Sequence, residues 1–142
     1  MDRTDKMKRV YLDDERTPIE ASNWEVCRNY DEFVSKVLEI GLENIDLMSL
    51  DHDLGDTAKE EYFGNVTQRN ILDYDNIKEK TGLDCAKWLI EYSMDNNIKL
   101  PLILVHSANP IGASNIMGYI NNYLNYQGFA ETCIKNIIPF TC

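Results

Sequence analysis

The sequence predicts a single-domain α/β protein built on a parallel sheet with helices packed on both of its faces. Short apolar runs typical of buried strands alternate along the chain with segments whose apolar residues recur at helical spacing. Pro101–Val105 is the clearest of these strands, and Thr81 introduces the clearest helix. The 142 residues are enough for one domain with one hydrophobic core.

Three strands and one helix are predicted in the first third of the chain. The expected strands are Lys8–Asp13, Trp24–Arg28 and Ile45–Leu50. The Thr17-Pro18 dipeptide forces a loop after the first strand, and the segment 15–23 is too short to hold the usual connecting helix. A helix begins at Asp31 and ends at Gly41, which is a natural C-cap.

The alternation of strands and helices continues in the second half of the chain. The capping box Thr81–Asp84 begins a helix whose apolar face extends to Met94. The fourth strand is Pro101–Val105, a helix is predicted for Ser114–Tyr126, and a last short strand lies around Ile137–Ile138. In the order 2-1-3-4-5, which is common among doubly wound sheets, strands one, three and four are neighbours.

Residues 54–80 form a connection that is much longer than usual. They number 27, whereas a strand and the next helix are usually joined by about two to six residues. We expect an insertion with local structure, or a lid. Its notable side chains are Tyr62, Phe63, Arg69 and Tyr74. The aromatic rings either stack on a base beside a phosphate held by the arginine, or pack on the domain as ordinary core residues.

Composition and charge exclude several classes of function. The formal net charge is −10, so the surface repels a long phosphate backbone and duplex DNA is not an expected partner. No apolar stretch approaches the ~18 residues that span a bilayer, and the first residues lack the apolar core of a signal peptide. The four cysteines show no metal or disulfide spacing. We therefore expect a cytoplasmic protein with reduced thiols and no membrane partner.

The only two histidines each follow directly after an apolar run. His52 stands between Asp51 and Asp53, and His106 follows the fourth strand. Because open α/β sheets bind ligands at the carboxyl ends of their strands, both imidazoles are expected at that edge. Histidine titrates near neutrality, so such a pair suits proton transfer in both directions. The alternative is a structural histidine that hydrogen-bonds a neighbouring aspartate.

Polar side chains follow three of the predicted strands at the point where each strand ends. Neighbouring strands are about 4.8 Å apart, so groups that end three adjacent strands lie within roughly 10 Å of one another. Buried polar groups without partners are costly, and the placement therefore favours a binding site over simple packing. The expected members are Asp13, Asp14, Asp51, His52, Asp53, His106, Ser107 and Asn109.

The carboxylates at this edge suit a metal ion. We expect either a bound Mg²⁺, with Asp13, Asp14 and Asp51 as its ligands, or at least one carboxyl group with a raised pKa. No other cofactor is indicated. The simpler alternative is that Asp13 and Asp14 cap a loop and that Arg16 is their salt-bridge partner.

Four motifs in a fixed order resemble a known family. They are Leu12-Asp-Asp-Glu-Arg-Thr-Pro18, Ser49-Leu-Asp-His-Asp-Leu-Gly55, Thr81-Gly-Leu-Asp84 and His106-Ser-Ala-Asn-Pro-Ile-Gly112. Together they resemble the cyclic-phosphate processing receiver-like domains of bacteria and their phages, over most of the chain from Val10 to Met117. The resemblance implies a receiver-like (flavodoxin-like) three-layer α/β sandwich and an action on cyclic phosphates associated with RNA-end processing.

Phosphorylated receivers are the second relative that the residues suggest. They carry an acidic pair after strand one and an aspartate after strand three, which correspond here to Asp13, Asp14 and Asp51. However, no lysine follows the last predicted strand, since Lys135 precedes it, and the helix between the first two strands is missing. The histidines also have no place in that pattern, so phospho-signalling is disfavoured.

The sequence as a whole indicates a cyclic phosphodiesterase-type hydrolase that acts on a small cyclic nucleotide or on a 2′,3′-cyclic phosphate RNA end. His52 and His106 are expected to divide the acid and base roles. Asp51 and Asp53 complete the catalytic set by orienting the imidazoles. The expected substrate-binding residues are Asp14, Arg16, Ser107, Asn109 and Gly112. The alternatives are a receiver-like module that sequesters a cyclic nucleotide without turnover and, for Ser107 and Asn109, simple helix caps.

Overall fold

The computed structural model describes residues 7–135 and 140–141, and a five-stranded parallel sheet forms its centre. The strands of this sheet are β1 (Lys8–Leu12), β3 (Glu25–Cys27), β4 (Ile45–Leu50), β5 (Leu102–Val105) and β6 (Ile134–Lys135). They lie in the order β3-β1-β4-β5-β6, and every neighbouring pair is parallel. Counted along the chain this is the order 2-1-3-4-5, which confirms the predicted α/β fold class.

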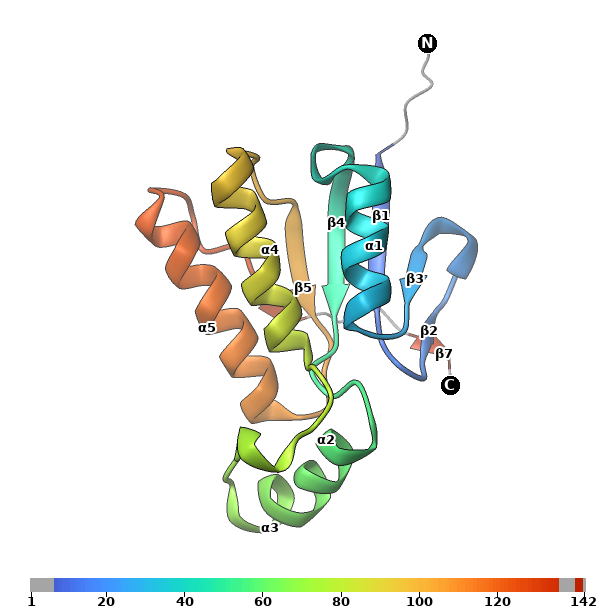
Figure 1. Ribbon diagram of the computed structural model, residues 1–142, viewed down its shortest axis with the longest axis vertical. Helices are drawn as coiled ribbons and strands as arrows, with labels where there is room; N and C mark the ends of the chain where they lie inside the picture. The colour runs from blue at the N-terminus through green and yellow to red at the C-terminus, as the bar shows by residue number, and fades with distance from the viewer. Residues whose placement is uncertain (1–6, 136–139, 142) are drawn as a thin grey trace.

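Three long helices among the described residues form a single layer. They are α1 (Tyr30–Ile40), α4 (Gly82–Asn96) and α5 (Pro110–Tyr126). Figure 1 shows them side by side in front of the sheet. Each one connects strands that step across the sheet in the same direction, so right-handed crossovers bring all three to one face. The opposite face belongs to the connection between β1 and β3, where the helix is missing, and the described residues form two layers rather than the expected three.

The connection between β1 and β3 contains a short strand where the sequence predicted only a loop. The strand β2 (Thr17–Pro18) pairs antiparallel with β7 (Phe140–Thr141), and a single turn, η1 (Ala21–Asn23), follows it. Thr17 and Pro18 are therefore paired as a strand of a second, two-stranded sheet and do not form an irregular loop. The last predicted strand, around Ile137–Ile138, lies outside the described residues, and β6 precedes it.

The ends of the long helices follow from their capping residues. Thr81 and Asp84 form the predicted capping box at the start of α4. Helix α5 begins at Pro110, earlier than the predicted Ser114, because Asn109 caps its first turn and proline suits the first helical position. The other 3-10 helical turn outside the insertion, within the described residues, is η2 (Leu42–Asn44), which follows α1. None of the described helices is both long enough and apolar enough to cross a lipid bilayer.

The two faces of the sheet carry different side chains. The face toward the helices forms the hydrophobic core with Val10, Leu12, Met48, Leu50, Ile103 and Val105. Strand residues that alternate with these point to the opposite face. There the buried ring of Tyr11 stacks on His106 and meets the edge of Trp24, and Ser49 hydrogen-bonds His106. His106 thus continues the alternation of β5 onto the face without helices.

Residues 54–80, which the structure describes in full, fold into short helices at the carboxyl ends of the strands (Figure 1). Their elements are α2 (Asp56–Glu61), the π-helical turn η3 (Tyr62–Val66), α3 (Thr67–Arg69) and η4 (Tyr74–Asn76). The buried carboxylate of Glu61 holds them together by accepting hydrogen bonds from Asn65, Asn76 and the backbone N–H of Asp73. The insertion therefore has an internal polar anchor of its own.

One prediction follows from the close packing of α4 against the end of β4. A Cβ added at Gly82 would lie 1.9 Å from the carbonyl oxygen of Asp51, so Gly82→Ala should destabilise the fold by about 1–3 kcal/mol. Gly118→Ala, at an exposed position of α5 with open space around it, should instead be neutral or stabilise by about 0.5–1 kcal/mol. Urea denaturation of both variants measures these changes, and equal stability of the two would contradict the packing.

Candidate active site

The loop after β1 is built around the buried side chain of Asp13. One carboxylate oxygen, Oδ1, accepts hydrogen bonds from the backbone N–H groups of Glu15 (2.9 Å) and Arg16 (2.8 Å), and Nε of Arg16 donates to Oδ2 at 3.0 Å. From the end of β3, Arg28 donates to the backbone carbonyls of Asp13 and Arg16 at 3.1 and 2.7 Å. These bonds hold the Arg16 guanidinium beside Asp13.

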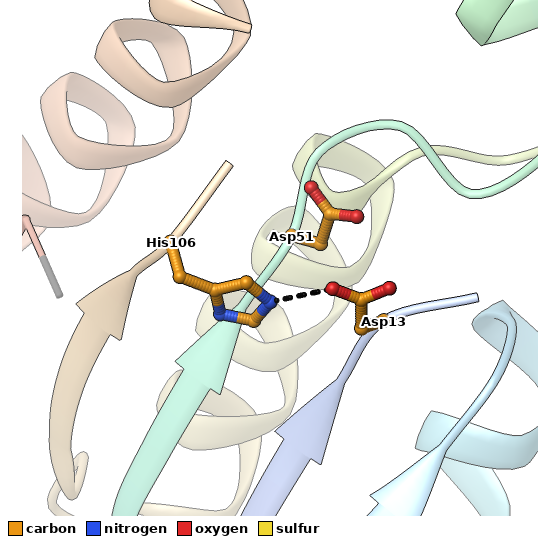
Figure 2. A group of neighbouring side chains, drawn as sticks. All are labelled: Asp13, Asp51 and His106. Carbon is orange, nitrogen blue, oxygen red and sulfur yellow. Dashed lines mark hydrogen bonds and ion pairs between the residues drawn. The ribbon is translucent and has the colours of Figure 1, made fainter. Parts of the chain in front are cut away.

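Asp51 ends the neighbouring strand β4 and is buried next to Asp13 (Figure 2). Its carboxylate lies 3.7 Å from Nη2 of Arg16 and accepts the backbone N–H of His52 at 2.8 Å. Burial, together with the negative charge of Asp13, raises the pKa of Asp51 to about 7. Burial acts in the same direction on Asp13, but the hydrogen bonds from His106, Arg16 and Glu15 outweigh it and lower the pKa of Asp13 to about 2. One carboxylate of the pair is therefore ionised, while the other titrates near neutrality.

His106 supports Asp13 from the face of the sheet opposite the helices. Its Nε2 lies 3.1 Å from Oδ2 of Asp13, and its Nδ1 lies 2.7 Å from the hydroxyl of Ser49. Burial lowers the pKa of His106, although Asp13 opposes this effect. The ring is accordingly neutral, with Nε2–H donating to Asp13 and Nδ1 accepting from Ser49. Figure 2 shows the imidazole directed at Asp13.

His52 is completely buried and joins three parts of the molecule. Its Nδ1 lies 2.6 Å from Asp53 and its Nε2 lies 2.9 Å from the hydroxyl of Tyr74, which also accepts from Asn115 of α5 at 3.0 Å. The Tyr74 hydroxyl therefore donates to Nε2, and Nδ1–H donates to Asp53. Gly112 packs against the ring, because a Cβ there would lie 2.4 Å from Cγ of His52. His52 thus links the strand end to the insertion and to α5.

A cavity of about 280 Å³ lies at the carboxyl edge of the sheet, between the strand ends and the insertion. It combines carboxylates, two cationic side chains and two aromatic rings. Its lining residues are Asp13, Asp14, Glu15, Arg16, Asp51, Asp53, Lys59, Tyr62, Phe63, Ser107 and Ala108. Both signs of charge therefore face one small volume that is partly shielded from water.

The structure brings together only some of the residues that the sequence assigned to the site. Those that line the cavity are Asp13, Asp14, Arg16, Asp51, Asp53 and Ser107. Those that do not line it are His52, His106, Asn109 and Gly112. Each imidazole hydrogen-bonds a carboxylate that lines the cavity, His52 that of Asp53 and His106 that of Asp13, but neither ring lines the cavity itself. The expected acid–base pair therefore does not meet there. Asn109 caps α5 and donates to Asp53 at 3.2 Å, so of its two expected roles it fills the structural one.

Two cationic residues of the site were not among those that the sequence indicated. Lys59 of α2 contacts Asp14 and lies 3.6 Å from Glu15, and all three residues line the cavity. The spacing of Lys59, Tyr62 and Phe63, at i, i+3 and i+4, was the available signal, because it puts a cation and two rings on one helical face. In contrast, nothing in the sequence around Arg28 indicated its role, because the groups that its guanidinium hydrogen-bonds lie in the loop after the neighbouring strand β1.

The residues fit the predicted Mg²⁺ site poorly. Within the described part of the chain, the ligand atoms that lie within 4.8 Å of one another belong to Asp13, Asp51 and His106. Asp14, the third predicted ligand, contacts Lys59 instead. Mg²⁺ prefers oxygen ligands, and the guanidinium of Arg16 already supplies positive charge to both carboxylates. The other expected outcome, a carboxyl group with a raised pKa, is found at Asp51.

Comparison with known protein families identifies the family of the chain. A family model described as cyclic-phosphate processing Receiver domain matches residues 8–122, an interval that contains the whole cavity and the insertion. No curated protein and no solved structure matches the chain.

The role of His52 as a link between elements predicts a stability effect at Tyr74. Tyr74→Phe removes the hydroxyl that bonds both His52 and Asn115, so the buried imidazole and a half-buried amide each lose a partner. We expect a loss of about 1–3 kcal/mol in the free energy of unfolding. Tyr126→Phe is the matched control, because Tyr126 is 86% exposed. Similar urea denaturation curves for the two variants would show that the insertion is not tied to the domain through His52.

The raised pKa of Asp51 predicts how stability depends on pH. Between about pH 4 and pH 7 the folded state keeps a proton on Asp51 that the unfolded state has already released. This group therefore lowers stability as the pH rises through that range. Asp51→Asn should reduce the decline, and its stabilisation relative to wild type should be greatest above pH 7. Asp46→Asn is the exposed control of equal charge change, and an identical pH profile for both variants would contradict the shift.

Proposed function

The chain belongs to the family of cyclic-phosphate processing receiver domains, and on this basis we propose that its cavity binds a cyclic phosphate ester and hydrolyses it. The substrate would be a small cyclic nucleotide or a cyclic phosphate at an RNA end. One observation carries the proposal: a single cavity contains the cations Arg16 and Lys59 together with Asp51, a carboxyl group whose pKa is about 7. The cations suit a phosphate, and the carboxyl group suits proton transfer at neutral pH.

The anion would be held by groups from both sides of the cavity. Arg16 extends from the loop after β1, and Lys59 extends from the insertion. Ser107 accepts the backbone N–H of Asn109 at 3.1 Å, which leaves its own O–H able to donate to a phosphate oxygen. The first-turn N–H of Gly112 is used by Asn109, so these two residues support the site from α5 and do not contact the ligand.

Asp51 would supply the acid–base step. A water molecule attacks phosphorus and gives its proton to the Asp51 carboxylate as the new P–O bond forms. The bond from phosphorus to one ring oxygen breaks, that oxygen takes a proton from solvent, and the product is a phosphate monoester. Asp51 then returns its proton to solvent, so one water molecule is consumed. Asp13 remains ionised throughout, because His106 and Arg16 stabilise its charge.

Sequestration without turnover is the second candidate, and the position of the histidines favours it. Neither imidazole lines the cavity, so the site lacks the pair of histidines that a two-sided acid–base mechanism would use. In that case the same cavity would bind the cyclic phosphate and release it unchanged.

Product analysis distinguishes the two candidates. Pure protein is incubated with 2′,3′-cyclic nucleotides, cyclic dinucleotides and RNA that ends in a cyclic phosphate, and the mixtures are separated by chromatography. Hydrolysis predicts a new phosphate monoester for at least one compound. Recovery of every compound intact, with some retained by the protein, would replace the hydrolase by the sequestering module.

A variant of Asp51 tests the chemical step. Asp51→Asn removes the titrating group but keeps its size, so turnover should fall at least about a hundredfold while the binding affinity stays within roughly tenfold. In the wild type, kcat should rise with pH and level off above about pH 7, because Asp51 must be ionised to accept a proton. Asp46→Asn serves as the control at an exposed position. Unchanged turnover in Asp51→Asn would rule out this residue as the base.

A further inference from the structure

Two aromatic side chains of the insertion line the same cavity as the charged groups. They are Tyr62 and Phe63, and their rings pack edge to face with centroids 5.0 Å apart. Phe63 is 65% exposed, whereas phenylalanine is usually buried. Its ring therefore offers an open apolar face beside a site rich in charge.

The backbone that carries Phe63 is held in place without help from its ring. Residues Tyr62–Val66 form a π-helical turn, a rare conformation that is frequent at functional sites. Glu61 precedes this turn and is anchored by hydrogen bonds from Asn65, Asn76 and the N–H of Asp73, while Val66 is buried at its end. The turn is thus fixed at both ends and presents Phe63 outward.

We propose that Phe63 is a stacking platform for the base of a nucleotide whose phosphate is held by Arg16 and Lys59, and that it makes the domain select ligands that carry a base. The inference rests on the proposed function, since it assumes that a phosphate occupies the cavity. Lys59 precedes Phe63 by four residues, so the cation and the ring lie on one face of the insertion. A nucleotide joins an anion to a flat aromatic group and matches both.

The size of the cavity supports a single nucleotide. Its volume of about 280 Å³ is just below the range of about 300–1,000 Å³ for small-molecule sites, so it has room for a small ligand and not for several nucleotides. Stacking on one aromatic ring accepts every base, because each base has a π-face. Phe63 therefore distinguishes ligands with a base from ligands without one, and it distinguishes only weakly among the bases.

Binding of paired ligands tests the role of Phe63. The dissociation constants of adenosine 2′,3′-cyclic phosphate and of glycerol 1,2-cyclic phosphate, which lacks a base, are measured by calorimetry for wild type and variants. Phe63→Ala should weaken binding of the adenosine compound about tenfold or more and leave binding of the glycerol compound within about twofold. Phe63→Trp should retain the affinity for the adenosine compound. Ile71→Ala, an exposed apolar residue of the insertion outside the cavity lining, should behave as wild type.

The other outcomes overturn the proposal in distinguishable ways. Equal affinities of wild type and Phe63→Ala for the adenosine compound would exclude stacking and leave the phosphate site intact. Equal weakening for both compounds would mean that Phe63 supports the shape of the cavity and does not contact a base. If the wild type binds neither compound, the proposed function and this inference both fail. Loss of self-association in Phe63→Ala, seen by sedimentation, would identify the exposed ring as a contact between copies of the chain.

Discussion

The site depends on two buried carboxylates, Asp13 and Asp51, which end adjacent parallel strands. Oxygen atoms of the two carboxyl groups lie within 4.8 Å of each other, and both groups are buried. Two such carboxyl groups cannot both ionise without strong stabilisation from their surroundings. The surroundings stabilise them unequally. Asp13 accepts N–H groups from its own loop, from the Arg16 guanidinium and from His106, whereas Asp51 accepts one backbone N–H and lies farther from Arg16. This asymmetry keeps Asp13 charged and leaves Asp51 with a pKa near 7.

The missing helix between β1 and β3 makes that asymmetry possible. In its place the chain forms a tight loop around Asp13, and the loop carries Arg16 into the site while Arg28 holds its carbonyls. Because no described helix covers the second face of the sheet, Tyr11 and His106 stack on each other there, and His106 reaches Asp13 from behind. The two-layer fold and the ionised state of Asp13 are thus consequences of the same short connection.

The sequence predicted the sheet edge well and the directions of its side chains poorly. Apolar runs that end in polar residues identified the ends of β1, β4 and β5. The strand order expected for a receiver-like fold is the order observed. Position after a strand does not specify the partner of a side chain: His106 continues the alternation of β5 but hydrogen-bonds Asp13, and His52 hydrogen-bonds Asp53. The contact of Lys59 with Asp14 joins residues 45 positions apart, and a single sequence carries no signal for such a pairing. The insertion was predicted by its length, while its position over the site depends on tertiary contacts.

The site combines two structural units that meet at His52. The sheet edge supplies the carboxylates and Arg16, and the insertion supplies Lys59 and the aromatic rings. His52 connects the units because Asp53 bonds one ring nitrogen and Tyr74 bonds the other. A buried link of this kind holds Lys59 of the insertion in place relative to the carboxylates of the sheet edge. His52 is therefore a positioning residue of the composite site, and under the proposed function proton transfer would fall to Asp51, the carboxyl group that faces the cavity.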